Sequence, residues 1–520
     1  MGISRIAALL LAAALAAPGA PSSAAAVYET SAEPAPRGEL DELVLARLRK
    51  LGIRPAKMCS DAVFLRRVFL DVTGTLPTPE EAGEFLASKD PGKRSALIEQ
   101  LLAREEYAGY QAMRWSDLLR VKAEFPINLW PNAAQAYHRW ILVSVRENKP
   151  YDQFARELLT ESGSNFRVPP VNFYRAMQSR EPQAIAQTTA LTFLGARAEK
   201  WPKERLAAMA AFFSRIGFKE TREWKEEIVY FDPAKPAPRN AAFPDGTRAR
   251  IAPGQDPREV FAAWLTSPKN PWFARAAVNR VWSWLFGRGI VHESDDIRPD
   301  NPPSNPELLA YLEREFAAGG FDLKRLYRLI LNSATYQLSP IPRSESPEAE
   351  ANFAFYPLRR LEAEVLIDAL CQITGTTESY SSAIPEPFTY IPEGQRSVSL
   401  PDGSISSSFL ELFGRPPRDT GLESERNNRP AAAQRLHLLN STHVQRKIEQ
   451  GPKLQALMRN ARNPRAGVGH LYLAILSRYP TDEELKAIGE YSQSGAASGR
   501  QNIVDLIWAL FNSAEFLYRH

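Results

Sequence analysis

Helix-start signals recur along the whole chain, and they restrict its fold more than any other feature of the sequence. At 78–81 the sequence TPEE places a proline directly after a threonine and a glutamate three residues after it. A capping threonine, a proline in the first turn and a glutamate at the third helical position are typical of an α-helix N-terminus. The sequences TDEE at 481–484 and DP at 256–257 repeat parts of this pattern. Because 41 prolines outnumber 28 glycines in a chain that is 44% apolar, we expect many helices joined by stiff connections.

Apolar residues also recur at helical spacing through most of the chain. In the last such segment Ile503, Ile507, Leu510 and Leu517 share one helix face. The other expected helices lie at 93–104, 133–146, 151–159, 183–194, 203–215, 257–265, 272–286, 306–317, 322–333, 357–373, 432–448, 467–476 and 482–492.

The pattern changes at 224–255. Residues 228–231 (IVYF) are β-like, four prolines follow, and Asp245-Gly246 is a turn signal. This predicts a small β-hairpin or loop module at a domain boundary. The expected fold is mainly α, with a helical domain at 39–223, a Pro-rich linker at 224–255 and a second helical domain at 256–520.

The N-terminus resembles an export signal. Arg5 precedes the apolar run IAALLLAAALAA at 6–17, and AAA at 24–26 offers a cleavage site. The run is shorter than the roughly 20 residues that span a bilayer. We therefore expect a signal peptide at 1–26, a mobile leader at 27–38, no membrane span, and a periplasmic or extracellular protein.

The composition excludes several classes of function. The 64 Lys and Arg nearly balance 60 Asp and Glu, which gives no electrostatic footprint for nucleic acid. Two cysteines and six histidines argue against a disulfide scaffold, a metal centre or any other cofactor site. Export makes a disulfide between Cys59 and Cys371 chemically feasible, and the sequence leaves their pairing open.

Several long motifs occur in order along the chain: FLRRVFLDVTGTLPTPEE (64–81), NRVWSWLFGRGIV (279–291), DDIRPDNPPSNPELLAYLEREF (295–316), FGRPPRDT (413–420) and LSRYPTDEEL (476–485). They resemble one bacterial family, the planctomycete cytochrome-c-associated proteins, which pair two domains of unknown function with catalogue numbers 1549 and 1553. The resemblance covers about residues 39–517. It implies no settled activity, although it carries a suspected link to polysaccharide breakdown.

The chain departs from this family at two places. The family commonly carries Cys-x-x-Cys-His, the attachment pattern of c-type haem, after an FLG segment. Here FLGARA at 193–198 runs directly into EKW. Leu422 and Ser424 also stand where a Cys-Glu-Cys-Glu-Arg string often occurs. The resemblance therefore implies a variant that has lost the haem site, and we expect no covalent haem.

Two charged segments supply candidate site residues. Asp295 and Asp296 are adjacent carboxylates that could bind a cation or act as acid and base, or could cap a helix and pair with Arg298. The second segment lies in a long loop, 374–430, that lacks helical pattern. Its carboxylates Glu423 and Glu425 are further catalytic candidates.

The same loop holds Arg415, Arg418 and Arg426, which we consider candidates for binding an anionic ligand. Their alternative is an internal ion-pair network, since a segment this poor in apolar residues cannot be ordered by hydrophobic burial. The tryptophans are expected mainly in the core, and sugar stacking by an exposed tryptophan is the less favoured alternative.

The function we predict is that of an exported cell-envelope protein, a non-haem binding or assembly component. Its partner would be another envelope protein or an anionic glycan. The alternative is an enzyme that acts on an anionic or carbohydrate substrate. An enzyme should bring its candidate charges together in one concave pocket, whereas a binding module should present a broad exposed apolar patch.

Overall fold

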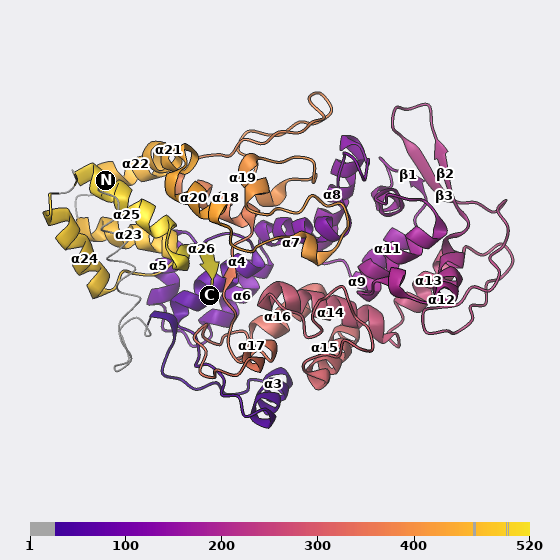
Figure 1. Ribbon diagram of the computed structural model, residues 1–520, viewed down its shortest axis with the longest axis horizontal. Coiled ribbons are helices and arrows are strands. Elements are labelled where there is room, and N and C mark those ends of the chain that lie inside the picture. Colours follow the sequence, from indigo (N-terminus) through magenta and orange to yellow (C-terminus); the bar gives the residue numbers. More distant parts are fainter. Residues whose placement is uncertain (1–26, 461–463, 496, 498) are drawn as a thin grey trace.

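The computed structural model describes residues 27–460, 464–495, 497 and 499–520, so the predicted signal peptide at 1–26 lies outside the described residues. Helix accounts for 53% of the structure and strand for 5%, which confirms the mainly α prediction (Figure 1). Within the described ranges, no helix is both long and apolar enough to cross a membrane.

The first half of the chain is a succession of short helices, two of which, α4 and α5, begin with a side-chain cap. Thr78 and Glu81 form a reciprocal capping box at α5, as the TPEE pattern predicts. Ser60 caps α4 by accepting a hydrogen bond from the Val63 N–H. The helices are α3 (Glu39–Lys50), α4 (Asp61–Val72), α5 (Pro79–Ala87), α6 (Lys93–Leu102), α7 (Glu105–Leu118), α8 (Pro131–Arg146), α9 (Tyr151–Thr160), α10 (Asn172–Arg175), α11 (Pro182–Leu194) and α12 (Lys203–Ala210).

The second half begins at Asp256, whose side chain caps α13. The single helix predicted at 432–448 is two helices, because Ser441 has extended backbone and caps α21 by accepting from the Val444 N–H. The helices are α13 (Pro257–Leu265), α14 (Pro271–Phe286), α15 (Pro306–Ala318), α16 (Leu323–Leu331), α17 (Glu348–Ala351), α18 (Ala363–Thr374), α19 (Ser408–Leu412), α20 (Ala432–Asn440), α21 (Thr442–Gln450), α22 (Pro452–Asn460), α23 (Pro464–Leu476), α24 (Asp482–Gln493), α25 (Gly499–Phe511) and α26 (Ala514–Leu517).

Two small antiparallel sheets accompany the helices. The first has the strand order β1 (Gly163–Ser164), β3 (Glu227–Phe231), β2 (Ile216–Glu220), and Ile216 is paired with Phe231. The predicted β-like run at 228–231 lies within β3, but the hairpin begins earlier than predicted, in β2. The second sheet pairs β4 (Arg359–Arg360) with β5 (Tyr518–Arg519), which brings the C-terminus to the middle of the molecule (Figure 1).

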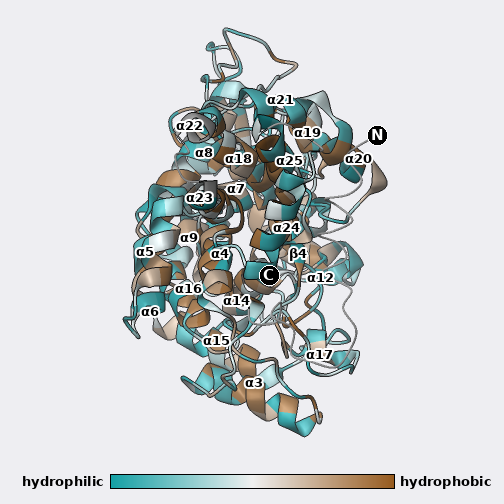
Figure 2. Ribbon diagram, turned by 90° about the vertical axis from the view of Figure 1, so that its left-hand side faces the viewer, coloured by the Kyte–Doolittle hydropathy of each residue, from teal (hydrophilic) through white to brown (hydrophobic). Residues whose placement is uncertain are grey.

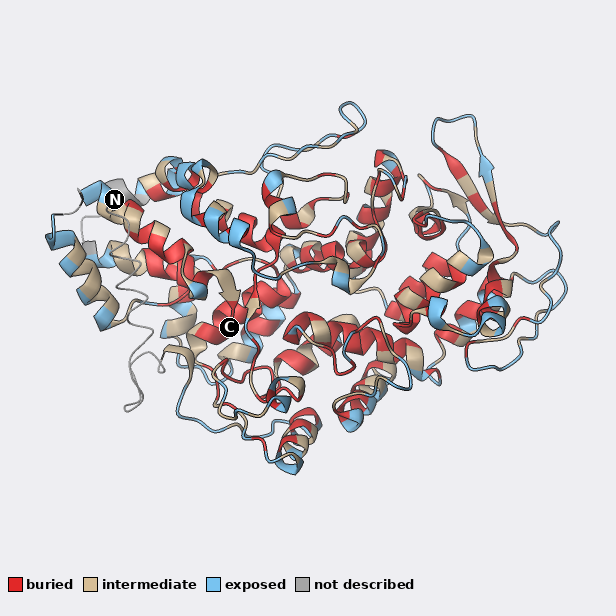
Figure 3. Ribbon diagram, in the orientation of Figure 1, coloured by how far each residue is buried: buried red, intermediate tan, exposed pale blue. Residues whose placement is uncertain are grey.

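The helices bury one face each, as α3 illustrates. Leu40, Val44 and Leu48 are buried, whereas Arg49 and Lys50 are exposed, and Figure 2 shows both colours along this helix. Burial of such stripes, drawn red in Figure 3, is the main stabilising contribution to a fold of this kind.

The buried apolar residues form two large clusters. The first contains residues from 40–241 and also from 261–356, while the second is formed mainly by residues from 361–516. The first cluster therefore draws on both sides of the 224–255 boundary. Whether the two predicted domains fold independently stays a prediction.

Candidate functional site

A cleft of about 610 Å³ lies between two segments that are far apart in the sequence. One wall runs from the end of α11 to the start of α12, and the other is the loop between α14 and α15. The backbone joins the walls at their base, where the Ile297 N–H donates to the Gly195 carbonyl at 2.8 Å. Gly195 has φ +59°, and a Cβ there would lie 2.9 Å from the Ser294 carbonyl oxygen. A glycine is thus needed for the two walls to approach this closely.

Polar contacts fix the shape of the second wall. The Asn301 amide donates to the His292 carbonyl at 2.8 Å and to the Asp296 carbonyl at 2.9 Å. The Ser304 N–H donates to the Ile290 carbonyl at 2.8 Å. The loop is therefore closed on itself, and it is also held by α14, where Asn279 bonds to the Val291 backbone and Arg280 pairs with Asp295.

The cleft is lined by more cations than carboxylates. Asp296 and Asp300 are its acidic residues, and both are paired to Arg298, at 3.2 and 2.9 Å. Lys200 Nζ lies 3.7 Å from Asp296, and half of its side-chain surface is exposed. The cations of the lining are Arg197, Lys200, Arg205, Arg275 and Arg298, and its tryptophans are Trp201 and Trp272.

Arg205 is a cation of the cleft whose guanidinium has no carboxylate partner among the described residues. Its Nε donates to the Pro244 carbonyl at 2.9 Å, and it makes no ion pair with any described residue. Its guanidinium lies 4.1 Å from the centre of the Trp201 ring. Partial burial lowers its pKa, as expected for a charge held away from water without a close anion. An anion in the cleft would relieve that cost.

The structure separates the two adjacent carboxylates, Asp295 and Asp296. Asp296 enters the cleft, whereas Asp295 is buried and accepts from Arg280 at 2.9 Å. Asp295 also accepts a hydrogen bond from the Glu423 N–H at 2.6 Å, so two sequence candidates do come together. Burial, followed by the nearby Asp295, raises the pKa of Glu423, whose carboxylate accepts from Trp284 Nε1 at 3.1 Å.

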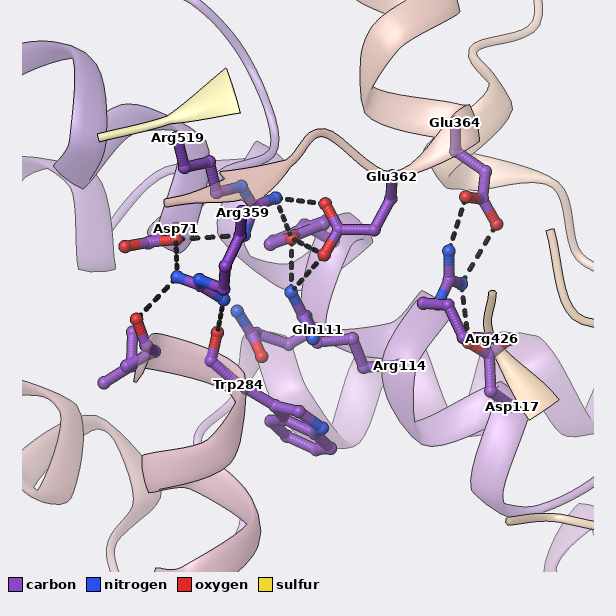
Figure 4. A network of polar contacts seen from close by, with 12 residues as sticks. Asp71, Gln111, Arg114, Asp117, Trp284, Arg359, Glu362, Glu364, Arg426 and Arg519 are labelled. Carbon is purple, nitrogen blue, oxygen red and sulfur yellow. Dashed lines mark hydrogen bonds and ion pairs between the residues drawn. The ribbon is translucent and has the colours of Figure 1, made fainter. Parts of the chain in front are cut away.

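The arginines of the long loop are paired with carboxylates of other elements, and Figure 4 shows Arg426 between Glu364 and Asp117. Arg426 bridges Glu364 on α18, at 2.6 Å, and Asp117 on α7, at 2.7 Å. Arg418 reaches the same Asp117 at 2.8 Å, and Arg415 lies 3.5 Å from Glu364. These contacts form the internal ion-pair network that the sequence leaves open as the alternative to ligand binding. Whether these arginines also bind a ligand stays a prediction.

The remaining candidate of the loop, Glu425, is held by backbone. Its carboxylate accepts from the Asp419 N–H at 2.9 Å and the Thr420 N–H at 3.2 Å. Burial raises its pKa. It therefore shapes the loop and does not point into the cleft lining.

These pairs belong to a larger buried set, which we call the ion-pair cluster. Arg519 on β5 pairs with Asp71 at 2.9 Å and with Glu362, and Arg114 pairs with Glu362 at 2.9 Å. Burial alone would raise the pKa of Glu362, but Arg519 and Arg114 outweigh it and hold the pKa well below its ordinary value. The cluster comprises Asp71, Arg114, Asp117, Arg359, Glu362, Glu364, Arg415, Arg418, Arg426 and Arg519. Figure 4 labels all of these residues except Arg415 and Arg418.

Two family models match the chain. Residues 39–214 match PSCyt2, described as a protein of unknown function (DUF1549), and residues 257–492 match PSD1, described as a protein of unknown function (DUF1553). The chain belongs to the family that pairs these two domains. Searches of curated proteins and of solved structures each found no match.

The paired domains each supply one wall of the cleft. Segment 194–205 ends the first matched domain, and segment 291–303 lies in the second. The cleft is therefore a product of the pairing, since neither domain contains both walls. The cleft cations are not among the candidate site residues that the sequence suggests. Segment 193–201, which contributes to the cleft, does stand out in the sequence as a place where the chain departs from the family.

No group of three or more His, Cys, Asp or Glu side chains among the described residues has the geometry to hold a metal ion. Cys59 is buried and Cys371 partly buried, and both are free thiols. The question of their pairing is thus answered, while the predicted absence of covalent haem stays a prediction.

Proposed function

We propose that this member of the paired-domain family is a binding component of the cell envelope. Its cleft binds a ligand that combines an anionic group with a ring, and the ligand class we propose is a carboxylated or sulfated sugar. The observation that carries the proposal is the lining: five cations face two carboxylates that share one arginine, beside two tryptophans. Arg197 and Arg275 pair with Glu293 and Glu313 outside the lining, so Lys200 and Arg205 are the cations that the proposal depends on. Arginine favours carboxylate and sulfate, and a tryptophan face packs against a ring.

Binding is better supported than catalysis. Of the four carboxylates considered as catalytic candidates, Asp296 lines the cleft, whereas Asp295, Glu423 and Glu425 do not. Asp296 and its neighbour Asp300 are both paired to Arg298, at 3.2 and 2.9 Å, so the carboxylates of the cleft already have a partner in the protein.

Export is part of the proposal, because the ligand class occurs outside the cytoplasm. It is supported by the sequence at 1–26. Fusing residues 1–30 to a phosphatase that is active only after export should give active enzyme, and replacing the apolar run at 6–17 by serines should abolish that activity.

The binding test uses the mature chain from Val27 with dextran sulfate, polygalacturonate and neutral dextran. We expect the two anionic polymers to bind, with affinity falling as salt rises. The double variant Lys200→Ala/Arg205→Ala should weaken binding about tenfold or more, and the exposed Arg435→Ala should not. Equal affinity for neutral and sulfated dextran, or no effect of the double variant, would overturn the proposal.

A further inference from the structure

Three aromatic side chains from distant segments meet on the surface, away from the cleft. Trp130 precedes α8, Trp224 lies in the turn between β2 and β3, and Phe388 belongs to the loop between α18 and α19. The ring centres of Trp130 and Trp224 are 6.1 Å apart with 23° between their planes. Phe388 lies 5.2 Å from Trp130 and 6.3 Å from Trp224. We call these three residues the aromatic platform.

The three segments are fixed to the fold by hydrogen bonds. The Glu124 carboxylate accepts from the Ala383 N–H at 3.1 Å, which ties the loop before α8 to the loop that carries Phe388. The turn that carries Trp224 is closed by Glu226, which accepts from Thr221 Oγ1 at 2.7 Å and from Ser164 Oγ at 2.5 Å. The rings are therefore held in place before any ligand arrives, which lowers the entropy lost on binding.

Exposed aromatic surface is concentrated at this place. Trp224 is 68% exposed and Phe388 42%, and the adjoining loops add Phe125 at 80% and Tyr390 at 67%. Figure 3 shows the β2–β3 tip and parts of the loop between α18 and α19 in the colour of exposed residues. Such concentration marks an interaction site, because isolated exposed apolar residues are the normal case.

The chemistry around the rings points to an uncharged ligand with flat faces. Among the residues that the structure describes, the exposed large aliphatic side chains are Leu358, Leu436 and Leu439, which belong to other segments. The platform therefore offers ring faces rather than a mixed protein-docking surface. Charges of both signs border the rings: Lys225 Nζ lies 5.4 Å from the centre of the Trp130 ring, and Glu223, next to Trp224, pairs with Arg167 at 3.1 Å. Such a mixed fringe supplies donors and acceptors for hydroxyl groups.

We propose that the aromatic platform binds the sugar rings of a neutral polysaccharide chain. One face of a pyranose presents C–H groups with a partial positive charge, which complement the negative potential of an aromatic face. The hydroxyl groups at the ring edge would meet the charged fringe. The platform shares no residue with the cleft lining and does not depend on the proposed function of the cleft.

The test is affinity gel electrophoresis of the mature chain from Val27, in gels that contain laminarin, xylan or hydroxyethyl cellulose. At least one polymer should retard the wild-type chain. Trp224→Ala should weaken that association about tenfold or more, whereas Trp224→Phe should keep most of it. Because Trp224 is 68% exposed, its replacement should leave the melting temperature unchanged.

Two control variants distinguish the platform from the rest of the surface. Tyr479→Ala removes another exposed aromatic, on the connection between α23 and α24, and should bind as the wild type does. Lys200→Ala in the cleft should also bind normally. Absence of retardation by all three polymers would overturn the inference. So would retardation that Trp224→Ala leaves intact, including the case in which Lys200→Ala abolishes it and the ligand belongs to the cleft.

Discussion

The ion-pair cluster and the cleft are both rich in arginine and acid, yet they differ in how far their charges are satisfied. In the cluster, Arg426 shares two carboxylates and is nearly buried. In the cleft, Arg205 has a backbone carbonyl and an aromatic ring as partners, and Lys200 lies 3.7 Å from its nearest acid. A high density of charged residues in a sequence therefore does not identify a binding site. A better indicator is a charged side chain that lines a concave surface and lacks an ion-pair partner.

The difference has an energetic reason. A buried ion pair gains little net stability over an apolar contact, but the loss of one partner strands a charge away from water. A half-exposed charge is stabilised by solvent and contributes about 0–1 kcal/mol through its pairs. Mutations in the two regions should therefore separate stability from binding.

The largest effect is expected for Arg426→Ala. Among the described residues, its loss leaves Glu364 with only Arg415 at 3.5 Å and Asp117 with only Arg418, so unfolding free energy should fall by about 3 kcal/mol in urea titrations. The exposed Arg435→Ala, the matched control, should stay within about 0.5 kcal/mol of the wild type. A fall for Arg426→Ala no larger than that of the control would show that the loop is not held by these pairs.

A smaller effect that depends on pH is expected for Glu362→Gln. At pH 7 the variant should lose roughly 2–3 kcal/mol, because charge-assisted hydrogen bonds to Arg519 and Arg114 become neutral ones. The folded-state pKa of Glu362 is below its ordinary value of 4.5. Its contribution is therefore complete above that pH and is lost as the pH falls toward the folded-state pKa.

Urea titrations from pH 7 down to pH 3 check this sign. The gap between wild type and Glu362→Gln should narrow below about pH 4.5, because the unfolded wild-type chain takes up a proton at Glu362 while the folded carboxyl stays charged. A gap that widens on acidification would contradict the assignment of Glu362 as a stabilising charge.

The smallest effect on stability is expected at the base of the cleft, for Gly195→Ala. A non-glycine residue at φ +59° costs about 1–2 kcal/mol, and the new Cβ would press against the Ser294 carbonyl. Gly320→Ala is a matched control, since Gly320 has φ +70° but open space around its Cβ position. Gly195→Ala should be the more destabilised and should alone weaken binding of polygalacturonate. Equal losses in both variants would mean that the walls tolerate separation.

Local features of the fold were predictable, and partners across the chain were not. The capping boxes predicted at Thr78 and Thr481 are confirmed. They were predictable because each depends on two residues only three positions apart. The ion pairing considered as the alternative to ligand binding in the long loop is present, and Arg418 pairs with Asp117 at a separation of 301 residues. A single sequence carries no signal for such a contact.

The candidate site shows the same limit at shorter range. Asp295 and Asp296 are neighbours, yet one is buried against Arg280 and the other lines the cleft. The direction of each side chain is set by the packing of α14 and by the closure of the loop on Gly195. Residue type could mark the segment, while the burial that separates a structural charge from a binding charge required the folded chain.

The central claim is that the cleft, and not the charged loop, binds the anionic ligand. Isothermal titration of polygalacturonate into Lys200→Ala/Arg205→Ala and into Arg426→Ala tests it most directly, at a temperature where melting curves show each variant folded. The account predicts that the cleft variant loses affinity about tenfold or more while its melting temperature is unchanged. It also predicts that folded Arg426→Ala binds like the wild type although it melts earlier. Loss of binding by Arg426→Ala with full binding by the cleft variant would contradict the account.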